Sequence, residues 1–243
     1  GKGLFTTELE RQLLDGTIDL AVHSLKDLPA DVPQGLTLAA VTARQYVHDA
    51  FVSSKYKSLA ELPCGARVGT SSLRRKAQLL ARRPDLSVSD LRGNVDTRLR
   101  KLDDGDYDAI ILAEAGLQRL GKADRITEIL PVDTMIPAVG QGALAIETRA
   151  DDEELKEILS FLNDAPTLAA TTAERTFLYA INGSCQVPVG VYGTVTGDTL
   201  TLESIIAAPD GTEAFRTTTT GPVSDSQKIG RKAARTLLDK GGR

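Results

Sequence analysis

The chain has 243 residues, of which 41% are hydrophobic and 26% charged, and its formal net charge is −4. This composition is typical of a globular protein with a hydrophobic core, and no apolar run reaches the roughly 18 residues of a membrane-spanning helix, so we expect no membrane partner. We also expect no nucleic-acid partner, because binding of nucleic acid usually needs a broad basic surface.

The first half of the chain contains two similar patterns of a helix followed by a strand. Residues 8–22 predict the end of an amphipathic helix that stops at a glycine and leads into a buried strand. Residues 99–112 repeat the same order, again with an Asp-Gly pair at the helix end. This repeat predicts two similar α/β units, each with a largely parallel sheet.

Between these two patterns, a strand, a polar turn and a helix follow one another twice. Residues 66–69 and 87–91 predict the strands, and residues 73–82 and 95–102 predict the helices. Asn94 is expected to cap the second helix, because its side chain can accept a hydrogen bond from a free N–H of the first turn. Open α/β sheets bind ligands at such strand ends, so both turns are candidate sites.

The last third of the chain has a different character, with short strands joined by turns that contain Gly and Asp. This order is typical of a small α+β domain with an antiparallel sheet. The predicted elements are helices at 151–162, 166–181 and 224–239, and strands near 187–195, 200–208 and 212–220.

The first candidate motif is the segment HSLKDLP at residues 23–29, directly after the first buried strand. Ser24, Lys26 and Asp27 stand where α/β proteins usually place their sites. A carboxylate at Asp27 can exchange protons with a substrate or stabilise a cation. The alternative is a simple turn with a helix cap, since Ser and Asp are both capping residues.

The second candidate motif is TSSLRR at residues 70–75, where a strand meets a helix. Hydroxyl groups and free N–H groups at a helix start bind carboxylates or phosphates, and neighbouring arginines add charge and bidentate geometry. The alternative is a capped surface helix with solvated arginines. Arg92 and Arg98, at the next strand-to-helix turn, favour a site for a small anion.

The third candidate motif is NGSCQVPVG at residues 182–190, with Cys185 among small residues. A thiolate there can form a covalent adduct with an electrophilic carbon. The alternative is a buried structural cysteine. The spacing between Cys64 and Cys185 predicts neither a disulfide framework nor a zinc site, and indicates reduced thiols in a cytoplasm-like compartment. Lys2, between two glycines, is either part of a mobile anion-binding loop or of a frayed terminus.

The order and spacing of these motifs resemble those of the porphobilinogen deaminase family, also called hydroxymethylbilane synthase. The resemblance covers essentially the whole chain, and the ordered set of motifs is specific although each motif alone is modest. The segments that carry it are GKGLF at 1–5, DLAVHSLKDLP at 19–29, VGTSSLRR at 68–75, LRGNVDTRL at 91–99, DAIILAEAGLQRL at 108–120, PAVGQGALAIE at 137–147 and GSCQVPVG at 183–190.

The resemblance implies two similar α/β domains like the halves of periplasmic binding proteins, and a small α+β C-terminal domain with an antiparallel sheet. The implied boundaries are residues 1–42 with 143–162 for domain 1, 48–137 for domain 2 and 165–243 for the cofactor-bearing domain. The family's N-terminal strand and helix are absent from this sequence, so we expect that an N-terminal part of domain 1 is missing from it. Residues 44–49 also depart from the more charged stretch usual in the family near the interdomain crossover.

The implied activity is that of a transferase in haem and porphyrin biosynthesis. A dipyrromethane cofactor is attached through a thioether to Cys185, porphobilinogen units lose ammonia and add head-to-tail, and hydrolysis releases hydroxymethylbilane. By resemblance, Asp27 binds pyrrole N–H groups, stabilises the azafulvene-type cation and transfers protons. The implied groups for the acetate and propionate side chains are Arg74, Arg75, Arg92, Arg98 and Arg119, assisted by Ser24, Lys26, Thr70, Ser72 and the loop residue Lys2.

The resemblance further implies a monomer in the cytoplasm, or in the plastid stroma if the source is a plant. Two other functions are compatible with the strand-to-helix sites. One is a non-enzymatic, two-lobed protein that binds small anions, which would need no thiol at Cys185. The other is the ligand-binding domain of a transcription factor, against which the lack of a helix-turn-helix pattern argues.

Overall fold

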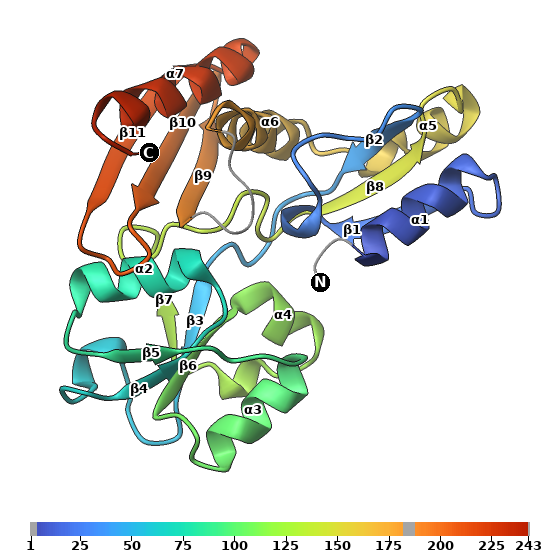
Figure 1. Ribbon diagram of the computed structural model, residues 1–243. Helices are drawn as coiled ribbons and strands as arrows, with labels where there is room; N and C mark the ends of the chain where they lie inside the picture. The colour runs from blue at the N-terminus through green and yellow to red at the C-terminus, as the bar shows by residue number, and fades with distance from the viewer. Residues whose placement is uncertain (1–3, 182–187, 243) are drawn as a thin grey trace.

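The computed structural model describes residues 4–181 and 188–242, which contain three separate sheets (Figure 1). The sheets have the strand orders β1-β8-β2, β5-β4-β6-β3-β7 and β11-β10-β9. The predicted fold class is confirmed, because two α/β parts precede a smaller C-terminal part with an antiparallel sheet. None of the helices within the described ranges has the length and hydrophobicity needed to span a bilayer.

The first sheet consists of β1 (Leu20–Ser24), β8 (Leu144–Arg149) and β2 (Leu36–Val41), and it lies between α1 (Leu4–Leu14) and α5 (Glu153–Leu159) (Figure 1). Both of its ladders are antiparallel. The prediction of a largely parallel sheet is therefore wrong here. The reason is that β8 enters the sheet some 100 residues after β2 and runs between β1 and β2 in the opposite direction.

The second sheet is mixed, because β4 pairs in parallel with β5 and β6 whereas β3 pairs antiparallel with β6 and β7. The prediction of a largely parallel sheet therefore holds only for half of its ladders. Its strands are β3 (Asp49–Val52), β4 (Arg67–Gly69), β5 (Ser87–Ser89), β6 (Ala109–Ala113) and β7 (Glu128–Leu130), and its helices are α2 (Leu73–Arg82), α3 (Val95–Asp103) and α4 (Glu114–Arg119).

Alternating side chains give this second sheet two apolar faces. Ile111 and Phe51 pack on one face with Leu79 of α2, whereas Ile110 packs on the other face with Leu99 of α3. Successive residues of a strand point to opposite faces, so an uninterrupted apolar run is what a doubly covered strand requires. The strand predicted at the end of the pattern over residues 99–112 is thereby confirmed as β6.

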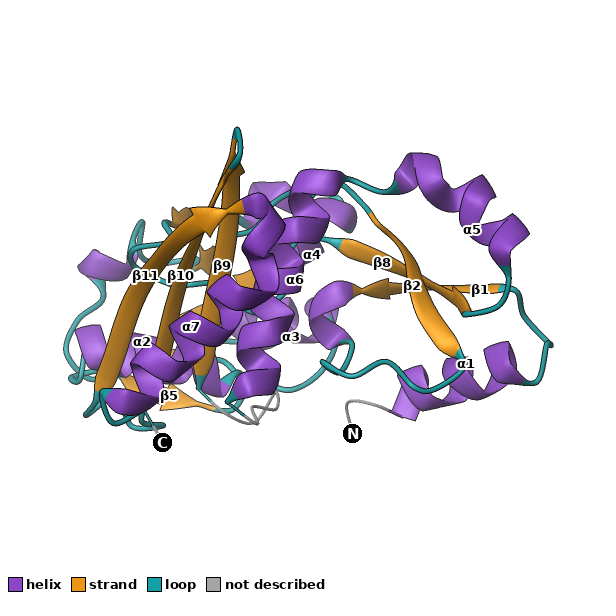
Figure 2. Cartoon of the chain, turned by 90° about the horizontal axis from the view of Figure 1, so that it is seen from above, coloured by secondary structure: helices purple, strands orange, loops and turns teal. Residues whose placement is uncertain are grey.

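The third sheet is fully antiparallel, and α6 (Ala165–Ala180) and α7 (Ser226–Asp239) cover it (Figure 2). Phe177 of α6 and Leu237 of α7 are completely buried against Leu202 in the sheet. The strands are β9 (Val189–Thr196), β10 (Thr199–Ala207) and β11 (Ala214–Pro222). Elements of this part lie within a few residues of their predicted positions.

Two segments, residues 42–48 and 137–143, cross between the first and second sheets and lie against each other. The N–H of Gln45 donates to the carbonyl of Gly142 over 3.2 Å. Gly142 has a φ of +92°, and a Cβ atom there would lie only 2.5 Å from the Gln45 oxygen. Glycine is required at this position because no other residue permits both the backbone conformation and the close approach.

Candidate functional site

The turn after β1 carries two of the predicted site residues on a fixed backbone. Lys26 and Asp27 belong to the 3-10 turn Leu25–Asp27, and Ser24 is the last residue of β1. Leu25 anchors the turn: its side chain is 1% exposed, and its N–H donates to the Ala143 carbonyl over 3.1 Å. Asp27 in contrast is exposed to solvent, so the turn presents a carboxylate from a rigid support.

The start of α2 is built from the hydroxyl groups of the second motif. Ser72 is the N-cap residue, and its Oγ accepts a hydrogen bond from the N–H of Arg75 over 3.4 Å. Thr70 is buried, and its Oγ1 accepts from the N–H of Ser72 over 3.2 Å. Both hydroxyl groups therefore form local backbone contacts that fix the beginning of the helix, as the alternative of a capped helix expected. The solvated arginines of that alternative are wrong, because Arg74 and Arg75 are buried.

A buried carboxylate binds both arginines of α2. Arg74 Nη1 lies 2.6 Å from Asp49 Oδ2, and Arg75 Nη2 and Nε lie 2.8 and 3.0 Å from Asp49 Oδ1. Burial alone would raise the pKa of the Asp49 carboxyl, but the charges and hydrogen bonds of the two arginines outweigh this and hold its pKa far below the usual range. The three side chains therefore form a charged cluster in the interior.

Further hydrogen bonds connect this cluster to the crossing segment and to the sheet. Arg74 Nη1 also donates to the Ile136 carbonyl over 2.7 Å, and Arg75 Nη1 donates to the Ile111 carbonyl over 3.1 Å. Gln141, which is 1% exposed, donates from Nε2 to Asp49 Oδ1 over 3.0 Å. The sequence reasoning missed Asp49 altogether. The GQG run in the crossing segment was a visible sign that Gln141 occupies a constrained position.

Lys26 lies on the turn after β1, and its pKa responds to the charges of the cluster on α2. Burial and the neighbouring charge of Arg75 lower the pKa of the Lys26 amine to about 8, although Asp27 and Asp49 act in the opposite direction. Hydrogen bonds connect the two motifs through the crossing segment, because the Leu25 N–H donates to the Ala143 carbonyl and Gln141, two residues earlier, donates to Asp49. The structure therefore brings the first and second motifs, which are some 45 residues apart in sequence, into one region between two sheets.

The remaining predicted arginines lie around this region in less constrained positions. Arg98 of α3 is half-buried, donates from Nε to the Gly93 carbonyl over 2.7 Å, and lies near enough to Arg75 for its charge to act on that group. Arg92 is 83% exposed and contacts Asp90 over 3.3 Å. Arg119 ends α4, and its Nη2 lies 3.4 Å from the Gly142 carbonyl.

Residues 44–49, where we expect a departure from the family pattern, form ion pairs. Besides the pairs of Asp49, Arg44 contacts Glu174 of α6 through Nη1 at 2.5 Å and Nη2 at 3.1 Å. Both side chains are nearly or fully buried, and Glu174 also accepts from the N–H groups of Gly140 and Gly193. This crossing segment is therefore tied to the C-terminal part of the molecule.

Two predicted site residues lie outside the described residues. These are Lys2 and Cys185, so the third motif receives no structural account. Among the described groups, burial and the charges of Arg75 and Arg74 lower the pKa of Lys26, against the effect of Asp27 and Asp49. Burial and the charges of Arg74 and Arg98 likewise lower the pKa of Arg75, against the effect of Asp49. This excess of positive charge suits a ligand that carries carboxylates.

Comparison with known protein families identifies the cofactor that this chain binds. Residues 1–157 match the family model described as porphobilinogen deaminase, dipyromethane cofactor binding domain, and residues 168–239 match the model of its C-terminal domain. The chain belongs to the porphobilinogen deaminase family. Porphobilinogen deaminases are transferases of tetrapyrrole biosynthesis, and this chain contains the domain that binds their dipyrromethane cofactor.

Curated relatives are similar over the whole chain. The porphobilinogen deaminase of Chromobacterium violaceum is 54% identical over 243 residues, which are 100% of this chain and 79% of that protein. That of Desulforudis audaxviator is 55% identical over 240 residues, covering 99% and 78% respectively. Among solved structures, a periplasmic substrate-binding protein of an ABC transporter from Coxiella burnetii matches with a TM-score of 0.43 and 17% identity over 68% of this chain and 79% of that one.

Proposed function

We propose that the region between the first two sheets, with Asp27 at its centre, is where porphobilinogen is deaminated and joined to the growing chain. The observation that carries this proposal is that the Leu25–Asp27 turn and the Asp49 cluster, which binds Arg74 and Arg75, are both hydrogen-bonded to residues 141–143. The cationic neighbours fit a dipyrromethane whose rings carry carboxylates, with Cys185 as its point of attachment. When bound, this cofactor supplies the end to which successive porphobilinogen units are joined.

Asp27 is the residue to which we assign the chemical steps. Its exposed carboxylate, on a turn anchored by the buried Leu25, can accept hydrogen bonds from pyrrole N–H groups. A negative charge at this place stabilises the positive charge that develops as ammonia leaves. The same oxygens can take up and return a proton, which makes Asp27 the general acid and base.

The cations divide into groups with different assignments. Arg74 and Arg75 are held by Asp49, and we assign their remaining N–H groups to substrate carboxylates. Lys26 adds a charge while its amine is protonated, and we assign Arg92, Arg98 and Arg119 to the carboxylates of rings farther along the chain. We also assign Ser24, Thr70 and Ser72 to positioning, and Lys2 to contacts with the growing product.

The organisation that we propose has three domains, with residues 1–42 and 143–162 in the first, 48–137 in the second and 165–243 in the third. The support is that each of these portions contains one of the three sheets. We propose that the enzyme works as a monomer in the cytoplasm, where a reducing environment keeps the Cys185 sulfur available for the thioether.

The replacement Asp27→Asn tests the central assignment. We expect turnover of porphobilinogen to fall by about 10²- to 10³-fold, the usual loss when one group that stabilises developing charge is removed. The urea-unfolding free energy should change by less than about 0.5 kcal/mol, because the side chain is exposed. Asp19→Asn is a matched control, since Asp19 is also exposed and contacts only Arg149 among the described residues. Near-normal turnover of Asp27→Asn would refute the role of Asp27.

The intact mass of the purified protein tests the attachment at Cys185. We expect an added mass equal to one dipyrromethane, and we expect Cys185→Ser to lack it. Cys64→Ser is the control, because Cys64 is exposed and has no assigned role. An adduct that persists in Cys185→Ser, or that disappears in Cys64→Ser instead, would contradict the attachment site.

A further inference from the structure

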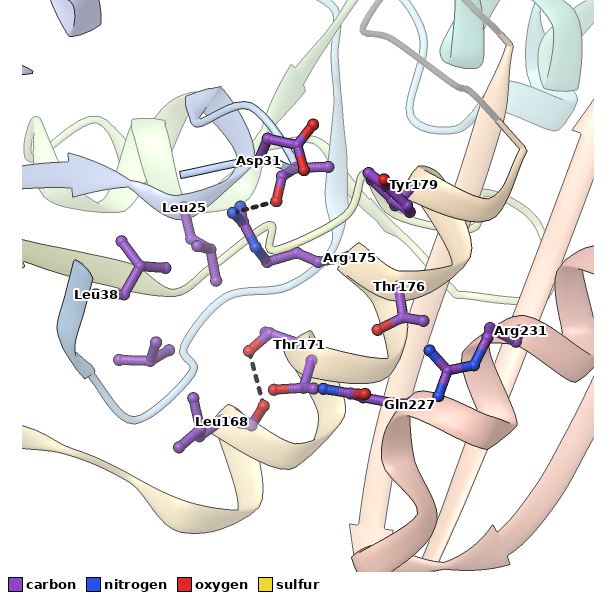
Figure 3. A pocket seen from close by; sticks show the side chains of 13 residues that line it. Leu25, Asp31, Leu38, Leu168, Thr171, Arg175, Thr176, Tyr179, Gln227 and Arg231 are labelled. Carbon is purple, nitrogen blue, oxygen red and sulfur yellow. Dashed lines mark hydrogen bonds between the residues drawn. The ribbon is translucent and has the colours of Figure 1, made fainter. Parts of the chain in front are cut away.

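An open pocket of about 350 Å³ lies next to the candidate catalytic turn, whose residue Leu25 lines it (Figure 3). Its walls come from three parts of the chain: Leu25 and the loop that follows it, β2, and the helices α6 and α7 of the C-terminal part. Of the residues to which the proposed function assigns chemistry or ligand binding, none lines this pocket. The proposed function therefore leaves the pocket without a role.

Two arginines line the pocket, and both retain unused hydrogen-bond donors. Arg175 of α6 donates from Nη2 to the Ala30 carbonyl over 2.9 Å, and this is its only hydrogen bond to the described part of the chain. Burial lowers the pKa of Arg175, while Asp31 and Glu147 raise it, and a guanidinium stays charged at neutral pH. Arg231 of α7 forms no hydrogen bond or ion pair with any described residue.

Polar and apolar groups occupy different sides of the pocket. Arg231 projects toward the side that carries Thr176 and Gln227, whereas Leu25, Leu38 and Leu168 lie on the other side (Figure 3). Asp31 lies beside Arg175 and partly neutralises it, so the unpaired positive charge is concentrated at Arg231. A ligand that complements both sides needs an anionic group and an apolar body.

We infer that this pocket binds a small amphipathic organic acid. The carboxylate pairs with Arg231, with the Thr176 hydroxyl and the Gln227 amide as neutral donors beside it. The apolar body lies against Leu25 and Leu168, where it removes hydrocarbon surface from water. Because Leu25 belongs to the turn that carries Lys26 and Asp27, the bound acid contacts the same turn that presents the proposed catalytic carboxylate.

Isothermal titration of the purified holoenzyme with 4-phenylbutyrate tests this inference, with the neutral 4-phenylbutyramide and inorganic phosphate as comparison probes. We expect the acid to bind more tightly than either. Arg231→Gln should weaken binding of the acid by about tenfold or more, because it removes a charge-assisted hydrogen bond. Arg231→Lys should retain part of the affinity. Arg235→Gln is the matched control: Arg235 is an exposed arginine of the same helix, outside the pocket, and its removal should change the affinity by less than twofold.

Three results would overturn the inference. These are no measurable binding of 4-phenylbutyrate, equal binding to the wild type and to Arg231→Gln, or tighter binding of the amide or of phosphate than of the acid. Turnover of porphobilinogen by Arg231→Gln without added probe should stay within twofold of the wild type. Failure of the pocket assignment would therefore not affect the role proposed for Asp27. Likewise, failure of the Asp27 assignment would not affect the binding predicted for the pocket.

Discussion

Two kinds of arginine surround the candidate site, and they differ in how their positions are fixed. Arg74 and Arg75 are 6% and 7% exposed and share the buried carboxylate of Asp49. Arg92 has a side chain that is 83% exposed, and its partner Asp90 is 68% exposed at 3.3 Å. The first pair is held in place by the protein interior, whereas Arg92 is free to adjust to whatever it binds.

This difference indicates how one region can bind a chain that grows. A buried, charge-paired guanidinium loses little further conformational entropy when a ligand arrives, so it fixes one carboxylate in a constant position. An exposed arginine loses more entropy on binding, but it can follow a group that changes place from one addition to the next. We therefore expect disruption of the buried pairs to lower mainly the free energy of unfolding, and replacement of an exposed arginine to lower mainly kcat/KM.

The largest effect is expected for Asp49→Asn. This change leaves two buried cations without their counter-charge, so the free energy of unfolding should fall by about 3–5 kcal/mol. Urea unfolding measures it, and Asp90→Asn, which removes the partner of an exposed arginine, should cost less than about 0.5 kcal/mol. Similar losses in the two variants would show that the buried ion pair contributes no more to the free energy of unfolding than the exposed one.

The stability that Asp49 contributes should also depend on pH, in a direction that its lowered pKa defines. Because the pKa of Asp49 is lower in the folded protein than in the unfolded chain, its contribution to stability is fully present above the ordinary carboxyl pKa and is lost as the pH falls through the lowered value. Wild-type stability should therefore decrease on acidification by more than that of Asp49→Asn. Equal pH profiles for both proteins would contradict the ion-pair account.

An intermediate effect is expected for Arg92→Gln. The free energy of unfolding should change by less than about 0.5 kcal/mol, since exposed ion pairs contribute little. The kcat/KM for porphobilinogen should fall by about tenfold, through loss of one charge-assisted hydrogen bond. Arg100→Gln, an exposed arginine on α3 without an assigned role, is the control. A loss of stability without a loss of kcat/KM would reverse the interpretation of Arg92.

The smallest effect is expected from the titration of Lys26. Its pKa of about 8 means that the amine loses its charge as the pH rises through this value, so the KM for porphobilinogen should rise a few-fold between pH 7 and pH 9. Lys26→Arg should shift this rise to higher pH, because a guanidinium remains protonated. An unchanged pH profile in Lys26→Arg would show that another group titrates.

Local signals in the sequence predicted most of the secondary structure. The helix predicted at residues 73–82 has these bounds in the structure, and Asn94 Oδ1 accepts the N–H of Thr97 over 2.9 Å as expected for a cap. Turns and caps depend on residues within a few positions of each other, so a single sequence contains the information needed to predict them.

Contacts between distant residues could not be predicted in the same way. Asp49 meets arginines 25 and 26 positions later, and Arg44 meets Glu174 at a separation of 130 residues. No local periodicity marks either carboxylate, because the partners come together only through the fold. The direction of β8 was missed for the same reason: it depends on how the chain returns from the second sheet. Thr70 and Ser72 illustrate a further limit. A Ser or Thr at the start of a helix can either cap the helix or bind a ligand, and the sequence is the same in both cases.

The return of the chain to the first sheet has a consequence for the order of folding. β2 and β8 are neighbouring strands, and the N–H of Thr42 donates to the Leu144 carbonyl over 3.0 Å, so about 100 residues form a loop whose ends touch. Closing a loop of that length in a disordered chain carries a large entropic cost, whereas an inserted unit that has already folded holds its two ends close together. We therefore expect residues 48–137 to fold first, which pulse-labelled hydrogen exchange can test by showing early protection in β3 and β6 and late protection in β8.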